Sequence, residues 1–321
     1  MKRRLRFALA TLVVLVPAAA GAQTWPGKQP IRVIIPFTAG SATDIVARTV
    51  MEQVSSQIGQ AIVVENRLGA GGTLGIGAVA KAEPDGYTFL AHSTSFAVTA
   101  TTYSNPGYDA RRDFSGITAL ASLPNVLAVT PNKYPTLQDM VAFARANPGK
   151  LNYATAGAGS ASHLNAERLA MAADIKVQHI PFKGGPDALT EIMAGRVDFY
   201  FVPLPPARGL MQGGKIAVLA VSSARRATAL PDVPTTVEAG FPNSDYNFWV
   251  GLWAPAATPK AIIERMNAET VKALQHPSVR EKIANAGGDP LPMQAAEFEA
   301  FTQKEIDVNA MLVKAAGMQV N

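Results

Sequence analysis

The sequence contains no cysteine, and this absence narrows the chemistry open to the protein. Disulfides, thiol nucleophiles, redox pairs and thiolate metal sites are all excluded. Aromatic residues make up only 7% of the chain, and beyond its first residues it has no run rich in Lys and Arg, which argues against nucleic acid or an anionic membrane surface as the partner. After the N-terminus no apolar stretch is long enough to span a bilayer.

Residues 1–22 have the three-part layout of a secretory signal peptide. Four basic residues among the first six precede an apolar run from Phe7 to Val16, and small residues then end at Ala22. We predict cleavage near Ala22 and export to the periplasm. Removing four of the 29 Lys and Arg residues leaves 25 against 24 acidic residues, so the net charge falls from +5 to +1. The basic character of the whole chain therefore belongs to the targeting segment.

The mature chain contains two stretches in which strand-like and helix-like patterns alternate, and this predicts an α/β fold. The first stretch runs from Ile31 to His92 and the second from Leu151 to Val221. Two longer apolar segments, Ile117–Val129 and Tyr246–Pro255, are placed where the chain would pass between two lobes. We interpret them as a two-stranded hinge.

The predicted domain organisation follows from this alternation. After the signal peptide, one lobe comprises residues 23–123 together with 247–321, and the other comprises residues 124–246. The helical tail of the chain is expected to pack back on the first lobe. Each lobe then has a mixed sheet flanked by helices.

The first candidate binding segment lies between the first strand and its helix. Small residues here let backbone N–H groups point at an anion, and the helix start adds partial positive charge. Ser41 and Asp44 are also spaced as a capping box that merely starts the helix, and the sequence leaves both interpretations open. The candidate ligand contacts in this segment are Phe37, Thr38, Ala39, Gly40, Ser41, Ala42 and Asp44.

A second segment of the same kind runs from Tyr153 to His163, again between a strand and a helix. It imitates a dinucleotide-binding fingerprint, but Ser162 stands at the sixth position and no acidic residue closes a following strand at the right distance. We therefore expect no nucleotide or other cofactor. The two segments would face each other across a cleft, where an open sheet binds at its strand C-termini. The candidate contacts here are Thr155, Ala156, Gly157, Ser160 and His163.

Three further polar residues are weaker candidates. Asp187 begins a predicted helix and could accept a hydrogen bond from a ligand amine or hydroxyl, or could simply complement the helix dipole. Ser93 and Thr94 follow the third strand, where their hydroxyls, like that of the neighbouring Ser95, could touch a ligand or form a turn or helix cap.

Catalytic and metal-binding patterns are absent from the sequence. The four histidines are scattered, with no His-Glu-x-x-His pattern and no Gly-x-Ser-x-Gly elbow, so we expect neither an enzyme nor a metal site. Ser160 and His163 lie three residues apart and keep open a lesser alternative, an exported hydrolase. Trp249 and Trp253 are interpreted as core residues and not as a sugar platform.

A series of motifs along nearly the whole mature chain closely resembles the Bug family, the TctC-like extracytoplasmic receptors of tripartite tricarboxylate transporters. In order, these motifs are Ile31–Phe37 with Ala39-Gly40 and Thr43-Asp44, Val64–Gly72, Pro84–Tyr87, Lys150–Ala154 with Gly157, Gly159-Ser160 and His163-Leu164, Pro181–Gly184, Leu230–Thr235 with Glu238–Gly240, and Ala254-Pro255 with Thr258-Pro259.

The resemblance implies a Venus-flytrap fold of the periplasmic-binding-protein type. It implies that a ligand carboxylate is held largely by backbone amides and bridging waters from the two loops, with selectivity set near Ser93, Thr94, Asp187 and Pro203. The sequence departs from the usual family pattern where Ser41 follows Gly40 and where Asp187 follows Pro186. An acid facing the cleft would disfavour a second carboxylate and favour an amine, hydroxyl or ring nitrogen.

These observations predict a monomeric periplasmic receptor that captures a small organic carboxylate by hinge closure and presents it to the membrane permease of a tripartite transporter. A receptor that reports its ligand to a membrane sensor kinase is the alternative. The identity of the acid is left open, because it depends on one or two side chains and a few waters.

Overall fold

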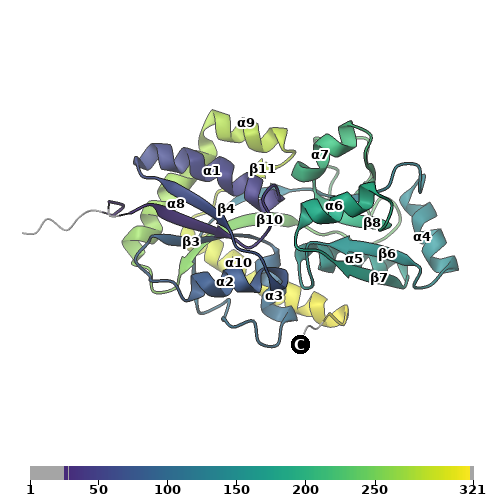
Figure 1. The fold of residues 1–321 in the computed structure, drawn as a ribbon, viewed down its shortest axis with the longest axis horizontal. Coiled ribbons are helices and arrows are strands. Elements are labelled where there is room, and N and C mark those ends of the chain that lie inside the picture. Colours follow the sequence, from purple (N-terminus) through teal and green to yellow (C-terminus); the bar gives the residue numbers. More distant parts are fainter. Residues whose placement is uncertain (1–24, 28, 319–321) are drawn as a thin grey trace, which may run out of the picture.

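The computed structural model describes residues 25–27 and 29–318, and the predicted signal peptide lies outside this part of the chain. The described residues form two α/β lobes side by side, each built around its own sheet (Figure 1). Both sheets are mixed and are flanked by helices. The predicted two-lobed α/β architecture is confirmed.

The first sheet has the strand order β11-β4-β10-β3-β1-β2. Strands β1, β2 and β3 run parallel, and β10 joins them antiparallel to β3. Because parallel neighbours share one direction, the ends of β1 and β3 open at the same edge, and this edge faces the second lobe. The strands are β1 (Ile31–Ile35), β2 (Ile62–Asn66), β3 (Thr88–Ser93), β4 (Phe114–Leu123), β10 (Phe248–Pro255) and β11 (Asp289–Pro290).

The second sheet has the strand order β7-β6-β8-β5-β9. Strands β6, β7 and β8 run parallel, whereas β5 is antiparallel to both β8 and β9. The start of β5 therefore lies beside the end of β8, with Asn125 opposite Pro203. The strands are β5 (Asn125–Val129), β6 (Leu151–Thr155), β7 (Val177–Pro181), β8 (Phe199–Pro203) and β9 (Ala217–Val221).

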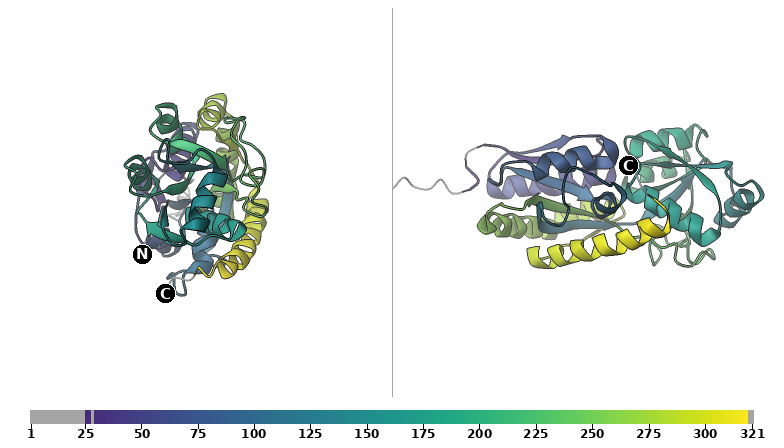
Figure 2. Two further views of the ribbon diagram at one scale, coloured as in Figure 1. Left: turned by 90° about the vertical axis from the view of Figure 1, so that its right-hand side faces the viewer. Right: turned by 90° about the horizontal axis from the view of Figure 1, so that it is seen from below.

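Helices cover both sheets. Those of the first lobe are α1 (Ala42–Ile58), the short 3-10 turn η1 (Ala70–Gly72), α2 (Thr73–Ala80), α3 (Ser95–Thr102), α8 (Lys260–Gln275), α9 (Pro277–Asn285) and α10 (Ala295–Ala315). Those of the second lobe are α4 (Leu137–Ala146), α5 (Ala161–Ala173), α6 (Gly185–Met193) and α7 (Leu204–Gln212). The C-terminal helices α8 and α10 pack on β4, and α10 runs along the first lobe as far as α5 (Figure 2).

The chain crosses between the sheets twice. The segment predicted as one apolar strand from Ile117 to Val129 is broken at Pro124, because proline has no N–H to donate to a ladder. The outgoing and returning chains are tied together by the Ser222 N–H, which donates to the Asn125 carbonyl at 2.9 Å, and by the Tyr246 N–H, which donates to the Ser222 carbonyl at 2.6 Å. This pair of crossing segments is the place where the lobes can turn relative to each other.

Each sheet is covered by apolar side chains on both faces. This explains why many strands lack an alternation of apolar and polar residues along their sequence. Trp249 and Trp253 are 2% and 1% exposed and pack against Phe298 of α10. Their interpretation as core residues is correct. Helix α3 is an element that the sequence pattern did not reveal, since its small and hydroxyl residues have no apolar periodicity.

Candidate ligand-binding site

A small cavity of about 40 Å³ lies between the lobes, at the edges where β1, β3, β5, β6 and β8 begin or end. In this arrangement it has room for only a few water molecules. Residues from both sheets line it: Phe37, Ser41, Ala42, Thr43, Ser93, Ser95 and Phe248 from the first lobe, and Asn125, Ala156, Ser160, Ala161, Ser162, Gly185, Tyr200, Val202, Pro203 and Pro206 from the second.

The lobes are closed over this cavity. The Tyr103 hydroxyl donates to the Ala158 carbonyl at 3.0 Å, and the Ala161 N–H donates to Ser95 Oγ at 2.8 Å. Arg208 also donates to the Asn285 carbonyl, so hydrogen bonds join the lobes directly. A second, larger hollow between the lobes is lined in part by Gly157, Lys183 and Asp187. The structure thus separates a small enclosed cavity from a wider outer one.

The first candidate loop delivers the start of α1 to the cavity. The chain turns at Gly40, whose φ of +77° favours glycine, and Ser41 caps the helix by accepting from the Asp44 N–H at 3.3 Å. The first N–H groups of a helix have no intrahelical acceptor, and the cap takes only one of them. The N–H groups of Ala42 and Thr43 therefore remain for a guest at the positive end of the helix dipole.

The second candidate loop delivers the start of α5 in the same way. Ser160 caps the helix by accepting from the His163 N–H at 3.4 Å, and its Oγ lies 3.0 Å from Ser162 Oγ. The Ser162 hydroxyl also accepts from the Ala156 N–H at 3.0 Å and so ties the strand end to the helix. The Ser162 N–H has no intrahelical acceptor, and neither does that of Gly185 at the start of α6. Amide donors from both lobes thus border one cavity.

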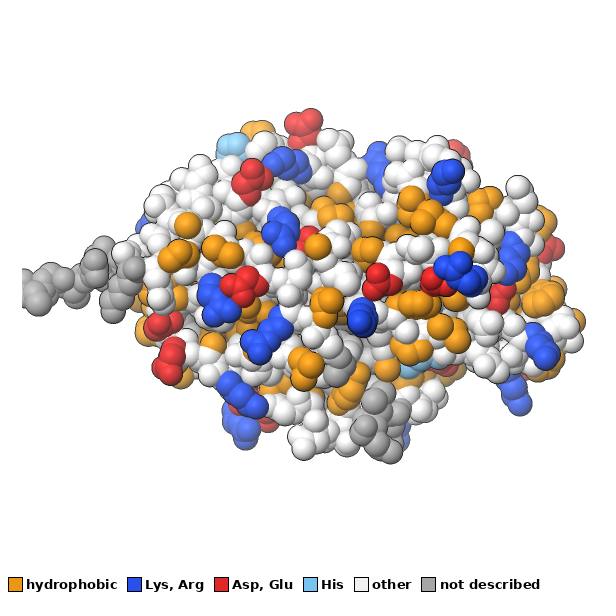
Figure 3. All heavy atoms as spheres, viewed as in Figure 1, with side chains coloured by type: hydrophobic (Ala, Val, Ile, Leu, Met, Phe, Trp, Pro, Cys, Tyr) orange, Lys and Arg blue, Asp and Glu red, His pale blue; other side chains and the backbone are white. Residues whose placement is uncertain are grey.

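The electrostatics of the cavity come from the backbone. Every lining side chain is apolar, a hydroxyl or an amide, and none is charged. Five helices, α1, α3, α5, α6 and α7, begin at the cavity, and each contributes partial positive charge there. On the face of the molecule shown in Figure 3, side chains of both signs are interspersed. An anion in this cavity would therefore meet aligned backbone amides and no salt-bridging side chain.

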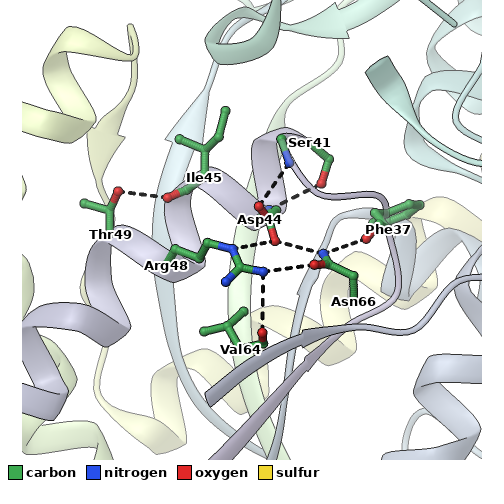
Figure 4. A network of polar contacts seen from close by, with 9 residues as sticks. Phe37, Ser41, Asp44, Ile45, Arg48, Thr49, Val64 and Asn66 are labelled. Atoms are coloured by element: carbon green, nitrogen blue, oxygen red, sulfur yellow. Dashed lines mark hydrogen bonds and ion pairs between the residues drawn. The ribbon is translucent and has the colours of Figure 1, made fainter. Parts of the chain in front are cut away.

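Asp44 holds the first loop in place and does not line the cavity. Its carboxylate accepts from the Gly40 N–H at 3.0 Å, from Arg48 Nε at 3.0 Å and from Asn66 Nδ2 at 2.8 Å (Figure 4). Burial alone would raise the pKa of Asp44, but the hydrogen bonds from Arg48, Asn66 and Gly40 outweigh it and hold that pKa below its usual value. The capping and bracing interpretation of Asp44 is the one that the geometry supports.

Replacing Asp44 with alanine should destabilise the fold by about 3 kcal/mol, because the change leaves three donors without their shared acceptor. The melting temperature should fall on the order of 5–10 °C. Glu52→Ala is the matched control, since Glu52 pairs with Lys282 on the exposed surface and such pairs contribute about 0–1 kcal/mol. Equal melting temperatures for the two variants would contradict this role of Asp44.

The structure brings seven of the sixteen predicted contacts to the lining of the enclosed cavity: Phe37, Ser41, Ala42, Ser93, Ala156, Ser160 and Pro203. The other nine do not line it: Thr38, Ala39, Gly40, Asp44, Thr94, Thr155, Gly157, His163 and Asp187. Thr94 accepts from the Trp249 N–H at 2.9 Å, Thr155 bonds to His179, and Ala39 and Gly40 are exposed. Thr38 sits at the contact between lobes beside Gly184.

Asp187 departs furthest from the sequence interpretation. Its side chain is exposed and lies at the outer hollow, together with Gly157. A carboxylate at that place does not line the enclosed cavity, so it is not placed to repel a second ligand carboxylate there. The specificity role predicted for Asp187 stays a prediction, and it concerns the outer hollow and not the enclosed cavity.

Ten lining residues were not among the sixteen predicted contacts: Thr43, Ser95, Asn125, Ala161, Ser162, Gly185, Tyr200, Val202, Pro206 and Phe248. Some were within reach, since Ser162 stands inside the second loop. Asn125 carried a visible signal too, as a polar residue that follows Pro124 in an otherwise apolar segment. Tyr200 and Phe248 carried none, because only the sheet order brings them to this edge.

Ser160 and His163 do not form a nucleophile and base. His163 Nδ1 accepts from the Gly159 N–H at 3.1 Å, and its ring stacks on His179 with the centroids 3.9 Å apart. Ser160 Oγ instead bonds to Ser162 and to the helix start. The two side chains are therefore committed to holding the loop.

The buried histidines make stability depend on pH. Burial lowers the pKa of His163 to about 3, with a further contribution from His179, and lowers that of His179 to about 4. Because an unfolded histidine titrates near 6.5, the unfolded chain binds more protons between about pH 6.5 and 4. We expect the melting temperature to fall as the pH is lowered through this window.

This dependence is measured by comparing melting curves of the parent with those of a His163→Gln, His179→Gln double variant. The variant should show a flatter decline between about pH 6.5 and 4.5, since other titrating groups are common to both proteins. Parallel curves would show that these histidines are not held neutral.

Among residues 25–27 and 29–318, no group of three or more His, Cys, Asp or Glu side chains could hold a metal ion. Within the same residues, no helix has the length and apolar character needed to cross a membrane.

Two lobes joined by a two-segment hinge, closed over a cavity bordered by helix starts, define a solute-binding protein. A family model described as "Tripartite tricarboxylate transporter family receptor" matches residues 46–318. The chain belongs to this family, and the resemblance drawn from its motifs is confirmed.

The comparisons with individual proteins agree with this membership. Protein BugT of Bordetella pertussis is 32% identical over 308 residues, covering 95% of this chain and 94% of its own. An adipate-bound protein of R. palustris matches with a TM-score of 0.87 and 31% identity over 91% of this chain and 98% of its own. MatC from Rhodopseudomonas palustris with bound malate matches with a TM-score of 0.85 and 29% identity over 89% of this chain and 99% of its own. The family and its solved members are solute-binding proteins, not enzymes.

Proposed function

We propose that this receptor captures a small organic carboxylate in the enclosed cavity and delivers it to the membrane permease of a tripartite transporter. The observation that carries the proposal is the meeting of helix starts from both lobes at one cavity without a charged side chain. A carboxylate accepts hydrogen bonds from several N–H groups at once and gains from the helix dipoles. The bound adipate and malate of the two similar structures support a carboxylate ligand.

The proposed mechanism is closure about the hinge. A carboxylate binds first to the amides at the start of α1, and rotation of the second lobe adds those at the starts of α5 and α6. The moving bodies are the lobes proposed from the sequence, residues 23–123 with 247–321 and residues 124–246. The closed surface, formed by both lobes, is what the permease recognises.

The setting of this activity is the periplasm, after removal of residues 1–22. Family membership and the basic-then-apolar N-terminus support export. The proposed receptor acts as a monomer, which is supported by the residues of both lobes that line the cavity in one chain.

A thermal-shift screen of residues 23–321 against mono- and dicarboxylates, amino acids and aromatic acids tests the proposal. An acid present at 100 times its dissociation constant should stabilise the protein by about 2.7 kcal/mol, which raises the melting temperature on the order of 5–10 °C. The corresponding uncharged amides and alcohols serve as controls. If no acid shifts the melting temperature at millimolar concentration, the receptor does not bind carboxylates.

A further inference from the structure

Asn125 is a buried amide whose two polar atoms are both without a partner. The residue is 1% exposed, and neither Nδ2 nor Oδ1 forms a hydrogen bond with any described residue. It stands at the start of β5, opposite the end of β8, and lines the enclosed cavity beside Val202 and Phe248. Its side chain thus presents one donor and one acceptor to the cavity.

The local fold does not need this amide. The carbonyl of Asn125 accepts from the Ser222 N–H at 2.9 Å, but any residue can supply a main-chain carbonyl. Burying a polar side chain without partners costs free energy, so the amide weakens the closed arrangement of the lobes unless a guest pairs with it. A guest in the cavity that pairs with both atoms would offset that cost.

The pairing rules narrow the chemistry of that guest. A carboxylate has only acceptors, so it would satisfy Nδ2 and leave Oδ1 without a donor. An ammonium group has only donors and would satisfy Oδ1 alone. A carboxamide carries an N–H beside a carbonyl and can pair with both atoms of Asn125 in one plane. In addition, no charged side chain lines the cavity to neutralise a second ligand charge.

We propose that Asn125 determines specificity by binding a carboxamide at the end of the ligand remote from its carboxylate. This inference rests on the proposed function, since the carboxylate is held by the helix starts. The ligand class is therefore a short monocarboxylate with a terminal amide, a monoamide of a dicarboxylic acid. The amide of Asn125 and the N–H groups of Ala42 and Thr43 then hold opposite ends of one molecule.

The test compares ligands that differ only at the remote end, by titration calorimetry. Succinamate, succinate and butyrate present an amide, a carboxylate and a methyl group, and the corresponding three- and five-carbon acids cover other spacings. At the best chain length we expect the monoamide to bind about tenfold or more tightly than the other two acids.

Two variants assign this preference to Asn125. Asn125→Leu removes both polar atoms, and Asn125→Asp keeps the shape but offers only acceptors. Both should bind the monoamide no more than about threefold more tightly than the alkyl acid of equal length.

Thr302→Val is the matched control, since Thr302 of α10 is 1% exposed and its hydroxyl also lacks a partner among the described residues. It should leave every affinity unchanged. A diacid or alkyl acid that binds as tightly as the monoamide at every length, or a preference that survives in Asn125→Leu, would overturn this inference and leave the carboxylate receptor intact. If no acid binds at all, the proposed function fails and the inference falls with it.

Discussion

Replacing Gly184 with alanine should weaken ligand binding about 5- to 150-fold and leave the melting temperature of the ligand-free protein nearly unchanged. Gly184 has an extended backbone with φ of −179°, which alanine adopts without strain. A Cβ added there would lie 2.1 Å from Thr38 Oγ1 and 3.0 Å from Thr38 Cβ. Thr38 belongs to the first lobe and Gly184 to the second, so the collision occurs only when the lobes close.

Rotation of the Thr38 hydroxyl does not relieve this collision, because the Thr38 Cβ and Cγ2 atoms are also within 3.0 Å. Relief requires that the lobes stay apart by several tenths of an ångström, and overpacking of this kind costs about 1–3 kcal/mol. This free energy makes closure of the lobes less favourable and therefore lowers the affinity for the ligand. Solution scattering of the variant with ligand should report a larger radius of gyration than that of the liganded parent.

Two further variants distinguish an effect on lobe closure from an effect on folding. Gly209→Ala places a Cβ where no atom lies within 4 Å, so its affinity should match that of the parent. Thr38→Gly removes the side chain that collides and should restore binding to Gly184→Ala, a coupling that a double-mutant cycle measures. Unchanged affinity in Gly184→Ala would show that these residues do not meet in the bound state.

Ala42→Pro should lower carboxylate affinity about 10- to 150-fold, because it deletes one of the N–H groups that border the cavity. Ala42 is the first residue of α1, a position where proline is well tolerated. The preceding Ser41 has φ −66° and ψ 160°, which suits a residue before proline. The helix should therefore remain while one donor to the ligand is lost.

The controls for this change distinguish the missing N–H from added bulk. Ala42→Val adds a comparable volume and keeps the N–H, so any loss that it shows is steric. Ala295→Pro makes the same substitution at the first residue of α10 and should not alter binding. If Ala42→Pro and Ala42→Val bind equally well, the Ala42 amide does not contact the ligand.

The sequence predicted the parts of the site that are local in the chain. Ser41, Ala42, Ala156 and Ser160 line the cavity because each belongs to a strand-to-helix loop, and such loops are visible as small residues between two periodic patterns. Ser41 and Ser160 also cap their helices, so helix capping and a place in the cavity lining are compatible for the same residues.

The rest of the site depends on contacts between distant residues. Asp44 was predicted as a ligand contact because the sequence does not reveal its hydrogen-bond partner. That partner, Asn66, lies on another strand, 22 residues away. Asn125 reaches the cavity because β5 is antiparallel to β8, a pairing that no local pattern encodes. Asp187 was placed in the cleft from its motif alone, whereas the packing of α6 turns it to the outer hollow.

The central claim is that amides from the two lobes bind one carboxylate in the enclosed cavity, and a crystal structure of residues 23–321 with the acid that gives the largest thermal shift tests it most directly. We predict carboxylate oxygens within about 3.2 Å of the N atom of Ala42 or Thr43 and of that of Ser162 or Gly185. A ligand seated in the outer hollow, or one whose carboxylate pairs with a Lys or Arg side chain, would contradict the account.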